Sequence, residues 1–507
     1  MKVFRKTDRT AGRSDILPAK TITPHKELDF GQTEFDMTKS RKLSFTEGPL
    51  FWRLIIFALP IMATGILQML YNTADKIVVG QFSGDPNALG AIGSTTFISG
   101  LIINFMAGLG SGAGVIVSQA FGAKRDDETR RAVHTALIAA VGVAVIMGCI
   151  AFATAAPLLK LLGTKAQFMD GALLYLNIIY SGILATSVYN TAAAIFRAVG
   201  DSRTPLILGS ISGLMNVLLN LVFVLGFGMS VAGVALATII SQYFSAAASI
   251  VILHKRKGES YSFSTKALRC DRRLLGRIIR IAIPTGLQST CFSVTNMITT
   301  SAVNTFDPAY VTAHSVAGNI DGMLDSTALA FSQAAMSAAG QNLGAMKPDR
   351  IKRVFFYTLA QSMTIMLVVA WTLRFFRGDI ATLFVDRADP EFDLIIAAVV
   401  EWTGIMLATY FLQGAMNSVL GTVRGLGYSL SPLILNIIGC CVTRTAWVYL
   451  VFPLERFHSF GGLALLYPVS WTASALLLAV IAVVAFRKIG RLKRELDAKE
   501  TGEKQIA

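Results

Sequence analysis

Four carboxylates lie in long apolar stretches of this 507-residue chain, namely Asp75, Asp321, Asp325 and Glu401. If these stretches cross a membrane, each acid needs a reason, because a charge at a helix centre costs about 2.5 to 3.5 kcal/mol on insertion scales. Burial disfavours the charged form of a carboxyl group, so an acid in a poorly hydrated pocket can exchange a proton near physiological pH. The four acids are therefore candidates for binding or exchanging a cation.

Asp75 belongs to a polar stripe with Gln68 and Asn72, which precede it by seven and three residues and so share its helical face. The stripe interrupts an otherwise apolar helix, which suggests that it points toward the protein interior. Alternatively, Asp75 is a solvated residue near the end of its helix, because Lys76 follows it directly.

Amide and hydroxyl side chains at helical spacing could complete a cation site beside Asp75. Asn216 and Asn220 are four residues apart, so their amides share one face and offer neutral oxygen ligands. Thr238 and Gln242 have the same spacing in the next apolar stretch. Such side chains also commonly bridge neighbouring helices, and the sequence leaves both roles open.

The C-terminal half carries a longer stripe of the same kind. Asp321 and Asp325 are four residues apart, with His314 seven residues before the first and Ser332 seven after the second. A structural hydrogen-bonding role and a functional role are both consistent with this pattern. Glu401 lies on the order of 10 Å into its own apolar stretch, where a water-lined vestibule would also account for it.

Composition indicates that the apolar stretches cross a membrane. At 53% hydrophobic and 15% charged residues, with a mean hydropathy of +0.57, the chain has too little polar surface for a soluble globule. About 20 apolar residues span a hydrocarbon core of roughly 30 Å. Continuous apolar runs exclude a membrane β-barrel and predict an all-α integral membrane protein. The twelve predicted helices cover 54–80, 88–120, 128–158, 168–198, 202–225, 231–254, 274–302, 310–342, 350–376, 394–424, 429–452 and 461–486.

The second half of the chain repeats the first. The sequence of Pro205 to Leu208 returns unchanged at Pro432 to Leu435. Further matched pairs are Pro60 with Pro284, Gln119 with Gln341, Gly122 with Gly344, Arg197 with Arg424, and Gly200 with Gly427. Six helices per half make the repeat parallel, as in transporters that bind their substrate between two lobes near mid-membrane. The sequence thus predicts two pseudo-symmetric lobes of six helices.

The net charge of +15 is concentrated in alternate loops. This distribution follows the positive-inside rule, places both termini in the cytoplasm and argues against nucleic acid as a partner. The expected division is a disordered cytoplasmic tail at 1–49, an N-lobe at 50–254, a cytoplasmic linker at 255–273, a C-lobe at 274–486 and a second cytoplasmic tail at 487–507. Because a polar aperiodic tail buries no core surface, removal of residues 1 to about 45 is expected to leave transport intact.

The absence of certain motifs limits which energy source could drive transport. The chain has no phosphate-binding Gly-x-x-x-x-Gly-Lys-Ser/Thr loop, no His-Glu-x-x-His and no Gly-x-Ser-x-Gly elbow. We therefore expect no enzyme and no cofactor beyond a bound proton or sodium ion, but a secondary transporter driven by an ion gradient. The intramembrane stripes are acidic, and we expect no Lys or Arg deep in a span, which predicts a lipophilic cation as the substrate.

Five short motifs together resemble the multidrug and toxic compound extrusion (MATE) family. They are Ala58 to Pro60, Tyr71 to Asp75, Gly122 to Lys124, Phe196 to Asp201 and Gly233 to Thr238. The resemblance runs from about residue 50 to 486. It implies a V-shaped pair of six-helix lobes in the inner membrane of a bacterium, which exports cationic amphiphiles in exchange for protons or sodium ions.

The resemblance also implies an N-lobe cation site, made in that family by an acid on the first helix, an Asn and an Asp on the fifth, and a Thr on the sixth. These positions correspond to Asp75, Asn216, Asn220 and Thr238. Asn220 departs from the family, because an amide replaces the second carboxylate. The lower negative charge favours protons over sodium. Pro60, which lacks a backbone N–H and permits a bend, is the expected conformational residue.

One branch of the family also carries acids in the C-lobe, at positions that correspond here to Phe292 and Gln413. That site is therefore expected to be absent unless Asp321 and Asp325 replace it. Two other functions stay open. A lipid-linked precursor flippase of the same superfamily usually has fourteen helices and a basic cavity. A membrane enzyme or channel would need a catalytic constellation or a filter-like loop. The sequence does not indicate an oligomeric state.

Overall fold

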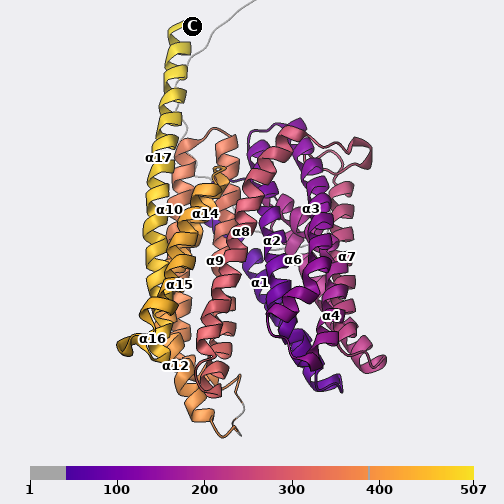
Figure 1. The fold of residues 1–507 in the computed structure, drawn as a ribbon. Helices are drawn as coiled ribbons and strands as arrows, with labels where there is room; N and C mark the ends of the chain where they lie inside the picture. The colour runs from indigo at the N-terminus through magenta and orange to yellow at the C-terminus, as the bar shows by residue number, and fades with distance from the viewer. Residues whose placement is uncertain (1–41, 386, 388, 507) are drawn as a thin grey trace, which may run out of the picture. The chain divides into compact units, whose positions relative to one another are not determined.

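The computed structural model describes residues 42–385, 387 and 389–506, and within them all regular structure is helical. Residues from Ser40 onward form one compact unit. The predicted tail before residue 42 lies outside the described residues. The helices form two bundles, which lie side by side in Figure 1.

The first bundle follows the predicted N-lobe. It consists of α1 (Leu50–Phe82), α2 (Ala88–Gly122), α3 (Asp126–Leu161), α4 (Ala166–Ser181), α5 (Ile183–Ala198), α6 (Arg203–Leu221) with the π-helical turn η1 (Val222–Gly226), and α7 (Val231–Lys255). A linker with the short 3-10 turn η2 (Thr265–Ala267) leads to the second bundle.

The second bundle repeats this order with more interruptions. It consists of α8 (Arg272–Val303), α9 (Pro308–Gly344), α10 (Pro348–Phe375), the short α11 (Arg377–Ala381), α12 (Phe392–Ala408), α13 (Tyr410–Gly425), α14 (Leu430–Asn436), η3 (Ile437–Val442), α15 (Thr443–Ala446), η4 (Trp447–Val451), η5 (Glu455–Phe457), α16 (Phe460–Ala464) and α17 (Leu466–Ile506). The all-α, two-lobe prediction is confirmed.

Eight of the described helices are long and apolar enough to cross a membrane, and two bent pairs raise the number to ten. The two remaining predicted spans are α8 and α9, which are 32 and 37 residues long but carry many polar side chains. The prediction of continuous helices over 168–198 and 394–424 is wrong. The chain bends by 47° between α4 and α5 and by 45° between α12 and α13. At the first bend, Gly182 packs so closely on α7 that a Cβ there would lie 2.7 Å from Ile239.

The last helix, α17, continues through the predicted C-terminal tail to Ile506. Residues from Arg487 onward are rich in Lys, Arg, Glu and Ala, which have high helix propensity. Lys493 on this extension forms an ion pair of 2.9 Å with Asp349 at the start of α10. The helix therefore extends beyond the apolar part of its span.

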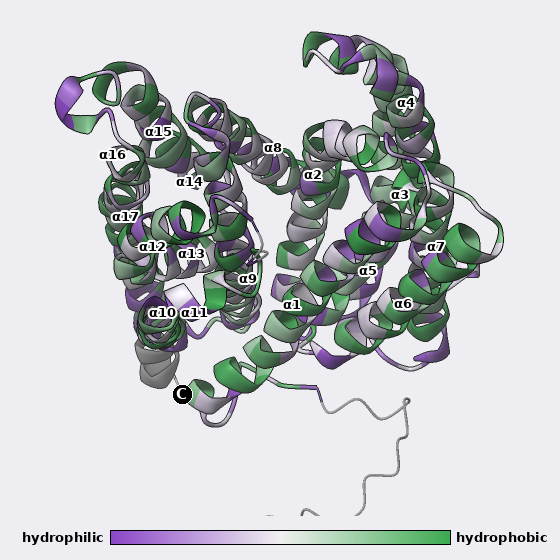
Figure 2. Cartoon of the chain, turned by 90° about the horizontal axis from the view of Figure 1, so that it is seen from below, coloured by the Kyte–Doolittle hydropathy of each residue, from purple (hydrophilic) through white to green (hydrophobic). Residues whose placement is uncertain are grey.

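Each bundle has its own apolar core. In the C-lobe it is built around the buried rings of Trp402, Tyr410 and Trp471. In the N-lobe, Leu159, Leu176 and other aliphatic side chains of α2, α3 and α4 take this role. Seen from below, α1 and α2 face α8 and α9, so these four helices line the boundary between the lobes (Figure 2). Any site between the lobes must be built on them.

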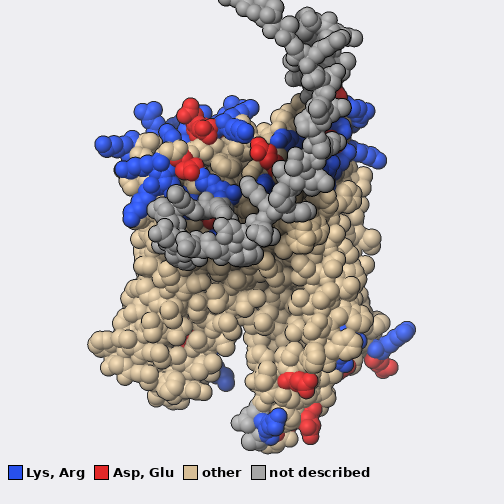
Figure 3. Space-filling model, turned by 180° about the vertical axis from the view of Figure 1, so that it is seen from behind, with Lys and Arg blue, Asp and Glu red and all other residues tan. Residues whose placement is uncertain are grey.

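Charge divides the surface into two ends. Lys and Arg gather at the end that carries the first turns of α3, α8 and α10, and a belt with few charged side chains follows (Figure 3). We call the end with the Lys and Arg side chains the basic face. The helices that cross the belt are apolar, and we call it the apolar belt. At the opposite end the space-filling surface is hollowed between the lobes (Figure 3). The lobes therefore meet toward the basic face and separate away from it.

A pseudo-symmetric clasp joins the lobes near the basic face. The amide of Gln119 on α2 donates to the carbonyl of Gly425 at 3.0 Å, and its repeat partner Gln341 on α9 donates to Ala198 at 2.8 Å. Glycine makes this approach possible. A methyl group at Gly122 would collide with the Gln341 backbone, and one at Gly344 would collide with the Gln119 backbone. The repeated Gln-x-x-Gly motif is thus the lobe contact itself.

Residues 42–49 correct the predicted boundary of the N-terminal tail. They form a strap across both lobes. On the N-lobe side the Leu43 amide donates to the Gly200 carbonyl at 3.2 Å, and on the C-lobe side the Phe45 amide donates to Gln341 Oε1 at 3.2 Å. The Phe45 ring is buried and packs against Phe57 at a centroid distance of 5.1 Å. Phe45 is an aromatic residue in a mostly polar segment, and the sequence pattern of that segment does not indicate that its ring is buried.

Truncation should distinguish the strap from the residues before it. Deletion of residues 1–41 is expected to leave the thermal unfolding midpoint unchanged, whereas Phe45→Ala should lower the stability by about 3 kcal/mol through loss of a buried ring. Differential scanning fluorimetry of the purified proteins measures both. Phe375→Ala is the matched control, since Phe375 is 79% exposed. Equal midpoints for Phe45→Ala and Phe375→Ala would show that the strap does not contribute to stability.

Candidate functional site

The structure brings together the four predicted N-lobe residues in two hydrogen-bonded pairs. Asn220 on α6 donates from its amide to Asp75 Oδ1 on α1. One turn earlier on α6, Asn216 donates to the Thr238 hydroxyl of α7 at 3.3 Å. Three helices thus converge on a polar site that contains one acid.

This site is built into the lobe interior. Asn220 is 0% exposed and Asn216 is 7% exposed, whereas Asp75 is half-buried. The side-chain amide oxygen of Asn220, Oδ1, is buried without a hydrogen-bond partner among the described residues. Immediately after Asn220 the helix widens into the π-helical turn η1, an irregularity that is frequent at functional sites. An amide oxygen and a carboxylate therefore lie close together, available to a cation or a proton.

Gln68 and Asn72 lie two turns and one turn before Asp75 on α1, and both are exposed in this structure. Tyr71 packs against α6, where its hydroxyl donates to the Ser210 carbonyl at 3.3 Å. Gly65 packs against α9, and a Cβ there would lie 2.7 Å from Ser326. At roughly 100° per residue, Gln68 and Asn72 point between these two contacts. They face the boundary between the lobes and do not hydrogen-bond to Asp75.

The helix α1 runs through Pro60 without interruption. The Thr64 hydroxyl donates to the Pro60 carbonyl at 2.8 Å. Proline has no N–H to donate to the carbonyl of Ile56 in the preceding turn, so the helical ladder lacks one hydrogen bond here. The conformational role of Pro60 stays a prediction.

The C-lobe acids are held by residues of α13. The Tyr410 hydroxyl donates to Asp321 Oδ1 at 2.8 Å, and the Gln413 amide donates to Asp325 Oδ1 at 2.7 Å. Asp321 is half-buried beside the ring of Tyr410. Asp325 is exposed, and Gly322, three residues before it, lies on the same side of α9. Gly322 in turn lies opposite Met69 of α1. The acids therefore have different surroundings, one toward the lobe core and one toward the lobe boundary.

Two other predicted residues do not join these acids. His314 packs edge-on against the Trp402 ring at a centroid distance of 4.9 Å. Glu401 lies against the backbone of Gly461 in α16, where any side chain at Gly461 would collide with its carboxylate. Neither residue hydrogen-bonds to Asp321 or Asp325 within the described part of the chain.

Arg444 contradicts the expectation that no basic residue lies deep in a span. It is 5% exposed, its Nε donates to Ser470 at 3.0 Å, and an Nη donates to Asn296 at 3.2 Å. The guanidinium also lies 4.6 Å from the centre of the Tyr467 ring and interacts electrostatically with Asp321. A position in the middle of the predicted span 429–452 was the signal that could have identified it.

Removal of this charge should destabilise the C-lobe. Arg444→Met would leave Asp321 without its basic neighbour and Asn296 and Ser470 without their donor, and breaking a buried charged network typically costs about 3 to 5 kcal/mol. We expect a thermal midpoint several degrees below the wild type. The exposed Arg491→Met serves as control. A midpoint for Arg444→Met equal to that of the control would contradict a structural role for Arg444.

Comparisons with known proteins agree with this architecture. The MatE family model matches residues 60–222 and again 284–450, once in each lobe. The probable multidrug resistance protein YoeA of Bacillus subtilis is 25% identical over 437 residues, covering 85% of this chain and 93% of the relative. The probable multidrug resistance protein YpnP of the same organism is 28% identical over 403 residues, covering 79% and 88%.

A solved structure has the same fold. It is the outward-facing conformation of a multidrug resistance MATE family transporter of the MOP superfamily, with a TM-score of 0.78 at 19% identity. The match covers 90% of this chain and 99% of that one. Because the family model matches more than half of the residues and both repeats, this chain belongs to the MatE family and is a multi-pass membrane transporter.

Proposed function

We propose that this protein exports lipophilic cationic compounds in exchange for a cation, with protons rather than sodium as the coupling ion. The single observation that carries the proposal is the Asp75–Asn220 pair inside the N-lobe. One carboxylate with amide and hydroxyl neighbours can hold one proton or one positive charge at a time. A sodium ion prefers several oxygen ligands with more negative charge, and an amide occupies the position of the second acid.

The charge balance of the lobes supports a cationic substrate. The N-lobe site contains Asp75, and the C-lobe contributes Asp321 and Asp325 against one buried guanidinium, that of Arg444. Arg444 is already engaged by Ser470 and Asn296, whereas the Asp325 carboxylate is exposed. These acidic groups thus outnumber the buried guanidinium, and Asp325 is the one that faces the lobe boundary.

Competition explains how the two cations are exchanged. Ionised Asp75 would attract the positive charge of the substrate, and protonation from the open side would remove that attraction and favour release. Protonation also weakens one bond that holds α1 against α6, so the same event can alter the helix near Pro60. A proton entering and a drug leaving would then use one site alternately.

Orientation follows from the charge distribution. The positive-inside rule puts the basic face in the cytoplasm of a bacterium, with the polytopic chain in the inner membrane. The hollow between the lobes then opens to the outside (Figure 3). The two relatives described above are named probable multidrug resistance proteins, which supports the same assignment.

A dye-efflux assay in intact cells tests the proposed function. Cells that express the protein should accumulate less ethidium than cells without it, and a proton ionophore should abolish the difference while a sodium ionophore should not. An anionic dye such as fluorescein provides the comparison, since the buried Arg444 would favour an anionic substrate or a lipid-linked precursor. Export of the anionic dye without export of ethidium would overturn the proposal.

A further inference from the structure

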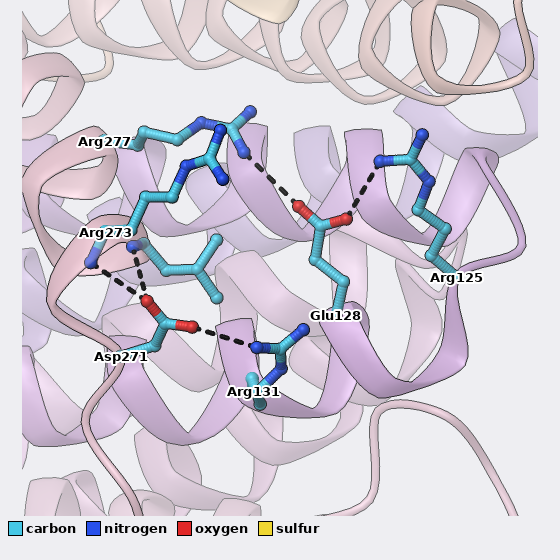
Figure 4. Close-up of a pocket in the computed structure, with 7 residues that line it drawn as sticks. Arg125, Glu128, Arg131, Asp271, Arg273 and Arg277 are labelled. Carbon is cyan, nitrogen blue, oxygen red and sulfur yellow. Dashed lines mark hydrogen bonds and ion pairs between the residues drawn. The ribbon is translucent and has the colours of Figure 1, made fainter.

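A basic pocket of about 250 Å³ lies between the lobes at the basic face (Figure 4). The N-lobe contributes the start of α3, and the linker and α8 contribute the other wall. The lining residues are Arg125, Glu128, Arg131, Asp271, Arg273, Leu274 and Arg277. Four guanidinium groups and two carboxylates give the pocket a net charge of +2.

The two acids are fully engaged. Glu128 accepts from Arg125 at 3.2 Å and from Arg277 at 3.4 Å. Asp271 pairs with Arg131 at 3.2 Å and caps α8 by accepting the backbone amide of Arg273. Both carboxylates already pair with arginines of the pocket, so the excess positive charge falls on the remaining guanidinium groups.

Arg273 carries that excess. Its side chain extends into the same pocket as that of Arg277 (Figure 4), and its guanidinium has no hydrogen bond or ion pair among the described residues. Two guanidinium groups that line one pocket repel each other, and an anion between them would offset this repulsion. Arginine pairs bind phosphate oxygens in a bidentate geometry that lysine cannot provide.

The internal repeat shows which kind of atom such a basic groove can bind. The repeat partners of Arg125, Glu128, Arg131 and Arg277 are Lys347, Arg350, Arg353 and Arg53, respectively. At that second groove the chain's own strap supplies the oxygen atoms. Arg350 donates to the carbonyls of Phe45 at 2.9 Å and Glu47 at 3.0 Å, and Lys347 donates to Thr46 at 2.9 Å.

Arg53 completes this second groove by donating to the carbonyls of Ser44 and Glu47. The basic groups of one half thus bind acceptor oxygens of residues 44–48. Among the residues that the structure describes, no such segment covers the first groove. The residues that precede α8 turn away instead, and the Asp271 amide donates to Thr135 of α3 at 3.0 Å. An external ligand with several oxygen atoms would supply the first groove with hydrogen-bond acceptors, as the carbonyls of the strap do in the second groove.

We propose that this pocket binds a phosphate group, supplied by an anionic phospholipid headgroup or by soluble phosphate. Its volume equals that of roughly eight water molecules, enough for a phosphate group with part of a glycerol. The pocket lies where α3 and α8 leave the apolar belt, the level at which basic pockets meet anionic headgroups.

Phosphate binding would act on the clasp. Arg277 donates to Gln119 at 3.1 Å, and Gln119 is the clasp residue that donates to Gly425. Because Arg125 and Arg131 come from the N-lobe and Arg273 and Arg277 from the helix that opens the C-lobe, a phosphate held by both sets links the two lobes. The ligand favours the state in which the lobes are closed at the basic face, since only that state brings both walls together.

Ligand titrations of the purified protein in neutral detergent test the site. The probes are dioctanoyl phosphatidylglycerol, dioctanoyl phosphatidylcholine and inorganic phosphate at constant ionic strength, and the readout is the thermal midpoint. We expect phosphatidylglycerol to raise the midpoint of the wild type more than phosphatidylcholine does. The double variant Arg273→Gln/Arg277→Gln should weaken the apparent affinity about tenfold or more.

The matched control is Arg269→Gln/Arg272→Gln, which removes the same charge from exposed neighbours outside the pocket. Arg273→Gln alone keeps the test valid if the double variant is unstable, because the Arg273 side chain supports no other residue. Inorganic phosphate that reproduces the effect with the same loss in the variants would identify a soluble ligand. Equal affinities of the pocket and control variants for phosphatidylglycerol and for inorganic phosphate would overturn the proposal.

Discussion

Asp75→Asn is expected to abolish gradient-driven efflux of a cationic dye while leaving membrane insertion intact. The amide keeps the size of the side chain and can still hydrogen-bond to Asn220, so the N-lobe site should stay folded. It cannot carry the charge or exchange a proton. A ligand shifts a conformational equilibrium only through its different affinity for the two states, and this substitution removes that difference. We expect efflux to fall at least about tenfold, close to the level of cells without the protein.

Ethidium efflux against an imposed pH gradient, at matched expression, measures this effect. Asp321→Asn and Asp325→Asn are the comparison variants, because they remove acids of the other lobe. We expect both to retain more gradient-driven efflux than Asp75→Asn. An active Asp75→Asn together with an inactive Asp321→Asn would move the coupling site to the C-lobe.

Gly344→Ala is expected to prevent the lobes from closing at the basic face. A methyl group there would collide with the Gln119 carbonyl. The Gln119 backbone cannot move away without disturbing the hydrogen bond from the Gln119 side-chain amide to the Gly425 carbonyl. Gly122→Ala should act in the same way through Gln341. Transport should fall about tenfold or more, since a cycle that cannot reach one of its two closed states cannot turn over.

Accessibility of a cysteine near the clasp gives a direct readout. A single Cys at Ala345, in a protein without its native cysteines, should be labelled faster by a water-soluble maleimide when Gly344→Ala is added. Gly142→Ala is the matched control, because a Cβ at Gly142 has no neighbour within 4 Å. Unchanged labelling and full transport in Gly344→Ala would contradict the clasp as a closing contact.

Much of the architecture could be predicted because its causes are local. Apolar runs of membrane length mark the spans, and the repeat fixes their grouping into lobes. Asp75, Asn216, Asn220 and Thr238 could be assigned to one site from helical spacing together with the family resemblance, and the structure joins them in pairs. Helical spacing also placed Asp321 and Asp325 on neighbouring positions of one helix.

What escaped prediction depends on contacts between distant segments. Phe45 lies in a polar stretch, and only its pocket between α1 and α9 explains its burial. Gly182, at the first bend, packs closely against α7, a contact that no local pattern reveals. Arg444 is different, because the sequence itself shows a charge inside an apolar span. Its partners Asn296 and Ser470 come from other helices, so even then the network could not have been assembled.

Proton movement driven by the substrate tests the central claim most directly. Purified protein in sodium-free proteoliposomes that contain a pH-sensitive dye should move protons out of the lumen when a gradient drives tetraphenylphosphonium inward, and in the opposite direction when the gradient is reversed. Asp75→Asn should show neither response. Proton movement that is absent in the wild type, or that requires added sodium, would contradict the assignment of Asp75 as a proton-exchanging group.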